Sequence, residues 1–289
     1  MRQSLLDRIV RFAAESDAVT ALILVGSQAR TEIPADEYSD TDLLLIASDA
    51  DLFTRSDAWL REIGDVHISF TEPTIDGQIE RRVLFDGAQD VDFVIMLQEA
   101  ATRALETGDA AFILSRGYRV LVDKAGLGIP PLPPPAPFKA ATEAEFTNTV
   151  NDFWYHTVWT AKKLLRKELW TAKFCVDSYM KWKLLWMIEQ HAHAISGKPV
   201  NTWYGGRFIE RWAREDILRD LEHCFAHYEQ ADMAKALLAT MALFRRLAAE
   251  TAQAAGFPYP AQADAYATEW VQSRLEPLLQ AEPAGGDGQ

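Results

Sequence analysis

The chain has 289 residues and a formal net charge of −13, from 29 lysines and arginines against 42 aspartates and glutamates. Hydrophobic residues make up 48% of the sequence and charged residues 25%, which is typical of a globular protein with a sizeable core. The acidic balance argues against a duplex-binding protein, since such proteins usually carry the opposite charge. It fits either solubility alone or a cationic substrate.

Other compositional signals exclude further classes. Cys175 and Cys224 are too few and too far apart to predict a disulfide framework or a zinc site. No apolar run reaches the roughly 18 residues needed to cross a bilayer. The N-terminus also lacks the apolar core and cleavage site of a secretion signal. We therefore expect a cytoplasmic monomer with no membrane and no nucleic-acid partner.

The first half of the chain alternates between helical and strand patterns. Helical periodicity occurs over 2–15, 50–63 and 98–107. Apolar or alternating runs of strand length occur over 20–25, 42–47, 66–70, 79–85, 91–97 and 118–122. This pattern predicts an α+β domain over residues 1–128, with a mixed sheet flanked by helices.

Proline marks the boundary between the two halves of the chain. The segment 126–137 contains six of the thirteen prolines, and proline fixes φ and lacks an amide donor. We therefore predict an extended, semi-rigid linker over residues 129–140. Beyond it, helical spacing occurs over 142–170, 174–196, 205–226, 231–255 and 263–280. These segments predict an all-α bundle over residues 141–283, followed by a flexible tail at 284–289.

Two aspartates open the second apolar strand. Asp40 and Asp42 are separated by one residue, so in a strand their side chains share a face. Like charges at that spacing repel one another unless a cation lies between them. Mg²⁺ prefers such oxygen ligands, combined with waters and substrate phosphates. Two solvated loop aspartates would explain the pair equally well.

A third carboxylate favours the metal interpretation. Asp92 lies one residue into the apolar run 91–96, and an ionised carboxylate within such a strand needs a partner. If this strand lies beside the one that Asp42 opens, the carboxylates form one cluster. Two metal ions bridging a triphosphate would neutralise that cluster. Asp90 shares the face of Asp92 but lies nearer the turn, so it is the weaker candidate.

Gly26 and Ser27 follow the first apolar strand directly. Glycine lets the backbone approach a phosphate closely, and a serine hydroxyl with backbone N–H groups can bind phosphate oxygens. The pair is also typical of an ordinary turn. It matches neither the dinucleotide-binding fingerprint nor the P-loop.

Together, the Gly-Ser turn at 26–27, the Asp-Thr-Asp segment at 40–42 and Asp92 resemble the motif of the nucleotidyltransferase superfamily typified by DNA polymerase beta. The segments 38–42, 85–92 and 151–162 are similar to blocks of a narrower family, the aminoglycoside 6-adenylyltransferases or streptomycin adenylyltransferases. The resemblance covers most of residues 1–230.

Two positions depart from that family. Gln28 stands where the family commonly has arginine, and Arg207 stands near a family lysine. Arginine is not an equivalent replacement for lysine at a phosphate.

The resemblance implies transfer of AMP from MgATP to a hydroxyl of a streptomycin-type aminoglycoside at its 6-position, with release of pyrophosphate and antibiotic resistance as the outcome. Asp40, Asp42 and Asp92 would hold two Mg²⁺ ions, with Asp92 as either a third ligand or the general base. The residues that would bind the nucleotide are Gly26, Ser27, Arg30 and Lys162.

An aminoglycoside is a polycation, so its pocket between the domains should be acidic and aromatic. The candidate acceptor-binding residues are Glu145, Asp152, Trp154, Tyr155 and Asp177. Two alternatives stay open at this point. The acceptor could be another antibiotic or a protein side chain, as in toxin–antitoxin nucleotidyltransferases, or the fold could be a non-enzymatic module. The complete set of motif carboxylates argues against the second alternative.

Overall fold

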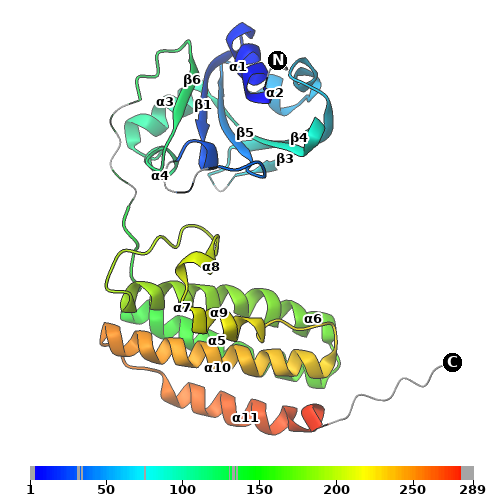
Figure 1. The fold of residues 1–289 in the computed structure, drawn as a ribbon, viewed down its shortest axis with the longest axis vertical. Helices are drawn as coiled ribbons and strands as arrows, with labels where there is room; N and C mark the ends of the chain where they lie inside the picture. The colour runs from blue at the N-terminus through cyan, green and yellow to red at the C-terminus, as the bar shows by residue number, and fades with distance from the viewer. Residues whose placement is uncertain are drawn as a thin grey trace, which may run out of the picture. The chain divides into compact units, whose positions relative to one another are not determined.

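The computed structural model describes residues 4–280, apart from residues 31, 32, 34, 75, 130, 132, 133 and 135. The tail predicted over 284–289 and part of the predicted linker lie outside the described residues. The chain divides into two compact units, Met1–Pro137 and Phe138–Gln289 (Figure 1). Within the described part, no helix is both long enough and apolar enough to cross a membrane.

The first unit is built on a mixed six-stranded sheet with the strand order β3-β4-β5-β2-β1-β6. Its strands are β1 (Val19–Val25), β2 (Thr41–Ala47), β3 (Val66–Pro73), β4 (Ile79–Phe85), β5 (Gln89–Leu97) and β6 (Arg119–Asp123). The pair β2–β5 is parallel, and the other neighbouring pairs are antiparallel. The parallel pair therefore lies at the centre of the sheet.

Helices cover both faces of this sheet (Figure 1). On one face, α1 (Leu5–Glu15) begins at the capping residue Ser4 and buries an apolar stripe beside α2 (Asp51–Thr54) and the 3₁₀ turn η2 (Ala58–Glu62). On the other face, α3 (Gln98–Thr107) and α4 (Ala111–Leu114) contribute Ala101 and Leu114 to a smaller apolar cluster.

The single helix predicted over 50–63 is wrong, because the structure divides it into α2 and η2. The carbonyl groups of Phe53 and Thr54 accept hydrogen bonds from the guanidinium group of Arg81. The indole N–H of Trp59 also donates to the Phe53 carbonyl. These side chains satisfy carbonyls that a continuing helix would have bonded, so tertiary contacts end the helix early.

The second unit is a helical bundle. Its long helices are α5 (Glu143–Leu165), α7 (Met180–Ile195), α10 (Gln230–Ala255) and α11 (Ala261–Gln280). Its shorter elements are α6 (Leu169–Phe174), the π turn η4 (Cys175–Tyr179), α8 (Ile209–Trp212) and α9 (Glu215–Glu222). The sequence had predicted one helix over 205–226, but Ala213 and Arg214 have extended backbone there and separate α8 from α9.

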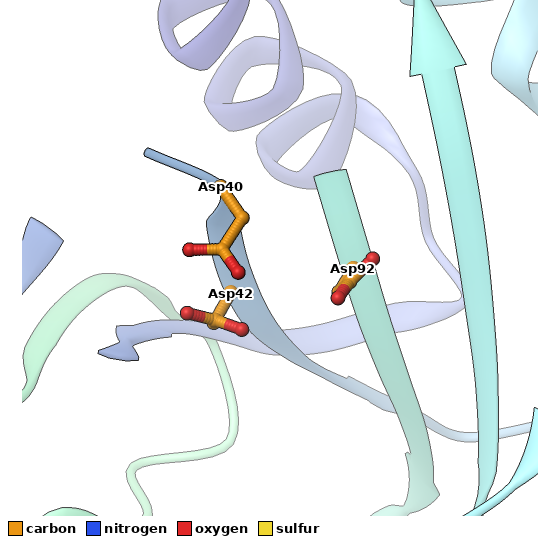
Figure 2. Close-up of side chains that lie close together, drawn as sticks. All are labelled: Asp40, Asp42 and Asp92. Atoms are coloured by element: carbon orange, nitrogen blue, oxygen red, sulfur yellow. The ribbon is translucent and has the colours of Figure 1, made fainter. Parts of the chain in front are cut away.

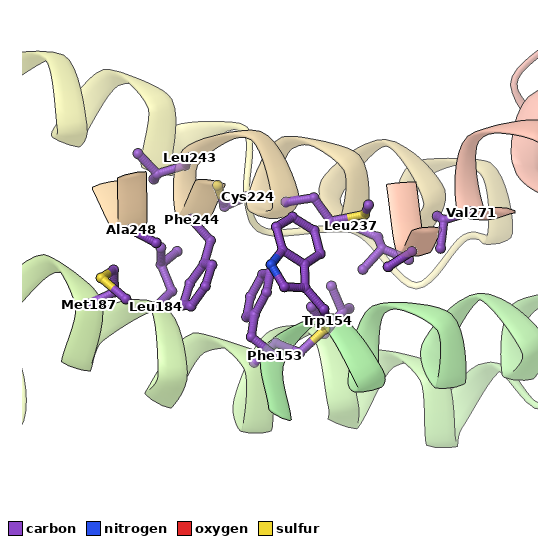
Figure 3. Close-up of a cluster of buried hydrophobic side chains, with 14 of the residues drawn as sticks. Phe153, Trp154, Leu184, Met187, Cys224, Leu237, Leu243, Phe244, Ala248 and Val271 are labelled. Carbon is purple, nitrogen blue, oxygen red and sulfur yellow. The ribbon is translucent and has the colours of Figure 1, made fainter. Parts of the chain in front are cut away.

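Aromatic packing forms the core of the bundle (Figure 3). The rings of Phe153 from α5 and Phe244 from α10 stack with centroids 3.6 Å apart, and Trp154 meets Phe244 edge to face. Leu184 of α7 and Val271 of α11 are fully buried in the same cluster. The sheet domain and the helical bundle confirm the predicted α+β fold class.

Candidate active site

Three carboxylates meet at one end of the central strand pair (Figure 2). In the parallel register of β2 and β5, Asp42 lies directly opposite Asp92. Asp40 comes immediately before β2, and one carboxylate oxygen from each of the three aspartates lies within 4.8 Å of the others. The structure therefore brings together the three aspartates that the sequence had singled out.

Strand alternation explains why these acids share a face. Asp42 points to the same side as Leu44 and Ile46, because side chains two residues apart in a strand share a face. The side chains of Leu44 and Ile46 are buried beneath the helices on that side of the sheet. The carboxylates thus stand at the border of an apolar core, and Asp92 is only 6% exposed.

The turn after β1 shapes the site from the other side. Gly26 opens the 3₁₀ turn η1 (Gly26–Gln28) with a φ of 66°, a value that favours glycine. A Cβ atom at this position would overlap the Oδ2 atom of Asp42. The close approach of a bare backbone to a carboxylate therefore depends on glycine being residue 26.

Polar side chains of the same turn hold the Asp40 segment. The buried Ser27 hydroxyl donates to two oxygens of Asp40. These are the backbone carbonyl oxygen at 3.3 Å and the side-chain Oδ1 at 3.4 Å. The amide of Gln28 donates to the same carbonyl at 3.2 Å and to Oγ1 of Thr41 at 2.6 Å. Gln28 therefore connects the turn to the start of β2 through hydrogen bonds. It stands at the position where the family that this chain resembles commonly has arginine.

Burial strongly perturbs the Asp92 carboxyl group. Its burial raises its pKa to about 7, the neighbouring acids Glu80, Asp90 and Asp42 act in the same direction, and Arg82 opposes them. Its Oδ1 atom is buried and has no hydrogen-bond partner. A buried carboxylate oxygen without a donor can bind a divalent cation or accept a proton. Together the three aspartates offer oxygen ligands of the kind that Mg²⁺ prefers.

Arg82 is a site residue that the sequence reasoning missed. It lies on β4 directly opposite Asp92, and its Nε atom is 3.7 Å from Oδ2 of that aspartate. The signal was present in the predicted hairpin, because counting back from the turn at Asp86 pairs the two positions. That count needs the exact length of the turn, which the sequence alone did not settle.

The residues predicted to bind the nucleotide lie in both units. Gly26 and Ser27 form the turn beside the carboxylates, and Arg30 follows that turn with a buried Nε atom that has no hydrogen-bond partner. Lys162 belongs to α5 of the helical unit, where it is exposed and lies 5.6 Å from the centre of the Trp270 ring.

Two of the predicted acceptor residues are engaged within the bundle. Glu145 closes a capping box with Thr142 at the start of α5. Asp152 accepts from the Tyr179 hydroxyl at 2.9 Å and pairs with Lys183 at 2.6 Å. Both contacts satisfy charges inside the helical unit itself.

The other three predicted acceptor residues line two different hollows of the helical unit. Trp154, which is buried, and Tyr155, which is 66% exposed, line a hollow of about 360 Å³ together with Lys162. Asp177 forms an ion pair with Lys173 and lines a larger pocket of about 810 Å³. The structure therefore does not gather the five predicted acceptor residues in one place.

Comparison with known proteins gives a consistent result along the chain. Residues 1–274 match the family model described as Streptomycin adenylyltransferase. An aminoglycoside 6-adenylyltransferase of Campylobacter jejuni is 25% identical over 263 residues, which cover 88% of this chain and 89% of that protein. The Bacillus subtilis (strain 168) protein of the same name is 22% identical, covering 89% of this chain and 92% of its own. A crystal structure of an aminoglycoside 6-adenyltransferase from Bacillus subtilis aligns with a TM-score of 0.45 and 18% identity, over 95% of this chain and 99% of that one.

We predict that Gly26→Ala destabilises the protein by about 2 to 4 kcal/mol, because the new methyl group meets Asp42 and the positive φ disfavours alanine. Urea unfolding gives the measurement. Gly108→Ala is the matched control, since Gly108 has a φ of 84° but no atom within 4 Å of the added Cβ. Equal losses in the two variants would contradict a close approach at Gly26.

We also predict that Asp92→Asn stabilises the metal-free protein at pH 8, by about 1 to 3 kcal/mol. The folded-state pKa of Asp92 lies above its ordinary value, so burial of its charge weakens folding above pH 7. As the pH falls through 7, Asp92 gains a proton in the folded state and the wild-type protein becomes more stable. The difference between the two proteins therefore shrinks towards pH 4.

Unfolding free energies in a chelating buffer at several pH values test this expectation. Asp17→Asn is the control, because Asp17 is exposed and lies outside the cluster, and its replacement should change the free energy of unfolding by less than about 0.5 kcal/mol. A loss of stability in Asp92→Asn at pH 8 would show that the buried carboxylate is not destabilising.

Proposed function

The chain belongs to the streptomycin adenylyltransferase family, and from that membership we propose that it transfers AMP from MgATP to the 6-hydroxyl of a streptomycin-type aminoglycoside. Its curated relatives are aminoglycoside 6-adenylyltransferases, so the chain is a nucleotidyltransferase of the aminoglycoside-modifying kind. Modification of the drug in this way gives antibiotic resistance. The streptomycin-type drug and its 6-hydroxyl group are our proposal.

One observation supports the chemistry most strongly: the cluster of Asp40, Asp42 and Asp92 beside the Gly26-Ser27 turn. Three carboxylates at the border of an apolar core repel one another, and a bound cation relieves that repulsion. A turn of small residues beside them leaves room for a triphosphate. The combination is suited to binding a metal–nucleotide complex.

We assign Asp40 and Asp42 as the metal ligands, with Asp92 beside them as the proposed base. The chemistry supplied by bound Mg²⁺ is neutralisation of the triphosphate and stabilisation of the charge that develops on the α-phosphoryl group. The backbone of Gly26 and Ser27 would bind the phosphates. Arg30 and Lys162 would add positive charge to them.

Asp92 is the residue that we assign as general base. Its Oδ1 atom carries no hydrogen bond, and a pKa of about 7 places it near the operating pH of a base. It accepts the proton of the acceptor hydroxyl while that oxygen forms a bond to the α-phosphorus. The bond from the α-phosphorus to the bridging oxygen breaks, and pyrophosphate leaves.

Acidic and aromatic residues of the helical unit support a cationic acceptor. Asp177 lines the larger pocket together with the exposed ring of Trp182, and Tyr155 lines the smaller hollow. We propose Tyr155 and Asp177 as candidate contacts of the aminoglycoside, whereas the roles of Glu145, Asp152 and Trp154 stay predictions from the sequence. The net charge of −13 favours the approach of a polycation over long range.

The test is pyrophosphate release from ATP and Mg²⁺ across a panel of acceptors that includes streptomycin, spectinomycin and kanamycin. We expect release with streptomycin, and a product that gains one AMP group at the 6-hydroxyl, located by NMR. Turnover with a different drug alone would overturn the proposed acceptor. Absence of turnover with every aminoglycoside would overturn the proposed function.

In the same assay we predict that Asp42→Asn lowers kcat by about 100-fold or more, because it removes a ligand charge from the site. Asp51→Asn is the matched control, since that carboxylate is exposed and pairs with Arg55 away from the cluster. Full activity in Asp42→Asn would refute the metal assignment.

A further inference from the structure

Arg82 stands in register with the proposed base. Residues 82 and 92 are directly opposed in the antiparallel pair β4–β5, so their side chains leave the same face of the sheet. Its Nε atom lies 3.7 Å from Oδ2 of Asp92, within ion-pair range. Among the described residues, no other lysine, arginine or histidine forms an ion pair with this aspartate.

The two oxygens of Asp92 are therefore in different surroundings. Oδ2 faces a guanidinium group, whereas Oδ1 is buried and has no hydrogen-bond partner. The electrostatic attraction between the Arg82 guanidinium group and Oδ2 favours the side-chain orientation in which that oxygen faces the arginine. The free oxygen then keeps a defined direction.

Arg82 also contacts acidic residues on two strands. Its Nε atom lies 2.8 Å from Oε1 of Glu72 on β3 and 3.3 Å from Oε2 of Glu80 on β4. These contacts position the guanidinium group on the sheet face that carries the carboxylate cluster. They also offset part of the like-charge repulsion among the acids.

The neighbouring residue on β4, Arg81, is an arginine whose contacts stabilise the fold. It points to the opposite face, is 6% exposed, and donates to the carbonyls of Phe53 and Thr54 and to the Ser69 hydroxyl. The side chain of Arg82 is 44% exposed, and ion pairs at such positions contribute little to stability. The ion pairs of Arg82 therefore contribute less to folding than the buried hydrogen bonds of Arg81.

We propose that Arg82 is a positioning residue for adenylyl transfer, which anchors Oδ2 of Asp92 and leaves Oδ1 directed at the acceptor hydroxyl. The inference rests on the proposed function and adds a residue to it. An oriented base matters because a small error in the position of a reacting group can lower the rate by about 100-fold.

The first experiment compares Arg82→Gln with Arg55→Gln, in which an exposed arginine of the same domain loses its ion pair with Asp51. We expect Arg82→Gln to lower kcat by about 10- to 100-fold while the KM values for ATP and acceptor change by less than about threefold. Arg55→Gln should leave both unchanged. Urea unfolding should show less than about 0.5 kcal/mol between either variant and the wild type.

The second experiment asks whether Arg82 acts through Asp92. If it does, the double variant Arg82→Gln/Asp92→Asn has the same kcat as Asp92→Asn alone, because the base that Arg82 positions is already gone. Added guanidinium chloride at low millimolar concentration should restore part of the activity of Arg82→Ala and none of that of Asp92→Asn.

Three results would overturn the inference: an unchanged kcat in Arg82→Gln, fully additive losses in the double variant, or a loss of activity that follows a loss of folded protein without rescue. A wild-type protein that transfers AMP to no acceptor would instead overturn the proposed function, and this inference with it. An active wild type with an unaffected Arg82 variant refutes the positioning role alone.

Discussion

The candidate site depends on the parallel pairing of β2 and β5. That register sets Asp42 opposite Asp92 and brings Asp40, just before β2, within reach of both. Because side chains alternate along a strand, a slip of one residue would direct Asp92 into the apolar layer beneath α1 and α2. The apolar side chains on both faces of the pair fix the register, so the core of the sheet positions the acids.

The same arrangement opposes stability. Burial and neighbouring acids raise the pKa of Asp92 to about 7, and Gly26 holds bare backbone against Asp42. A site of this kind is stable only when a cation or a counter-charge is present, and it is therefore suited to binding a metal–nucleotide complex. In the chain itself, Arg82 supplies one such counter-charge to the side of the cluster. The positioning role proposed for Arg82 would combine charge compensation with orientation of the proposed base.

Local pattern predicted the strands, the carboxylate cluster and the helical second half, because these depend on alternation and spacing that the sequence displays directly. Features that depend on long-range contacts were missed. The helix over 50–63 is broken by hydrogen bonds from Arg81 of β4, and Arg82 meets Asp92 only through an exact hairpin register. Helical periodicity likewise did not show which acceptor candidates would be engaged inside the bundle. Trp154 lies in the core and Asp152 is paired with Lys183.

In our proposal, the cluster of Asp40, Asp42 and Asp92 binds the metal of a nucleotidyltransferase. Electron paramagnetic resonance of Mn²⁺, titrated into the protein with a non-hydrolysable ATP analogue, tests it most directly. We expect saturable, nucleotide-dependent binding to the wild-type protein and a loss of at least about tenfold in affinity in Asp42→Asn. Equal Mn²⁺ binding by the wild type and Asp42→Asn, or no binding above that of the free nucleotide, would contradict it.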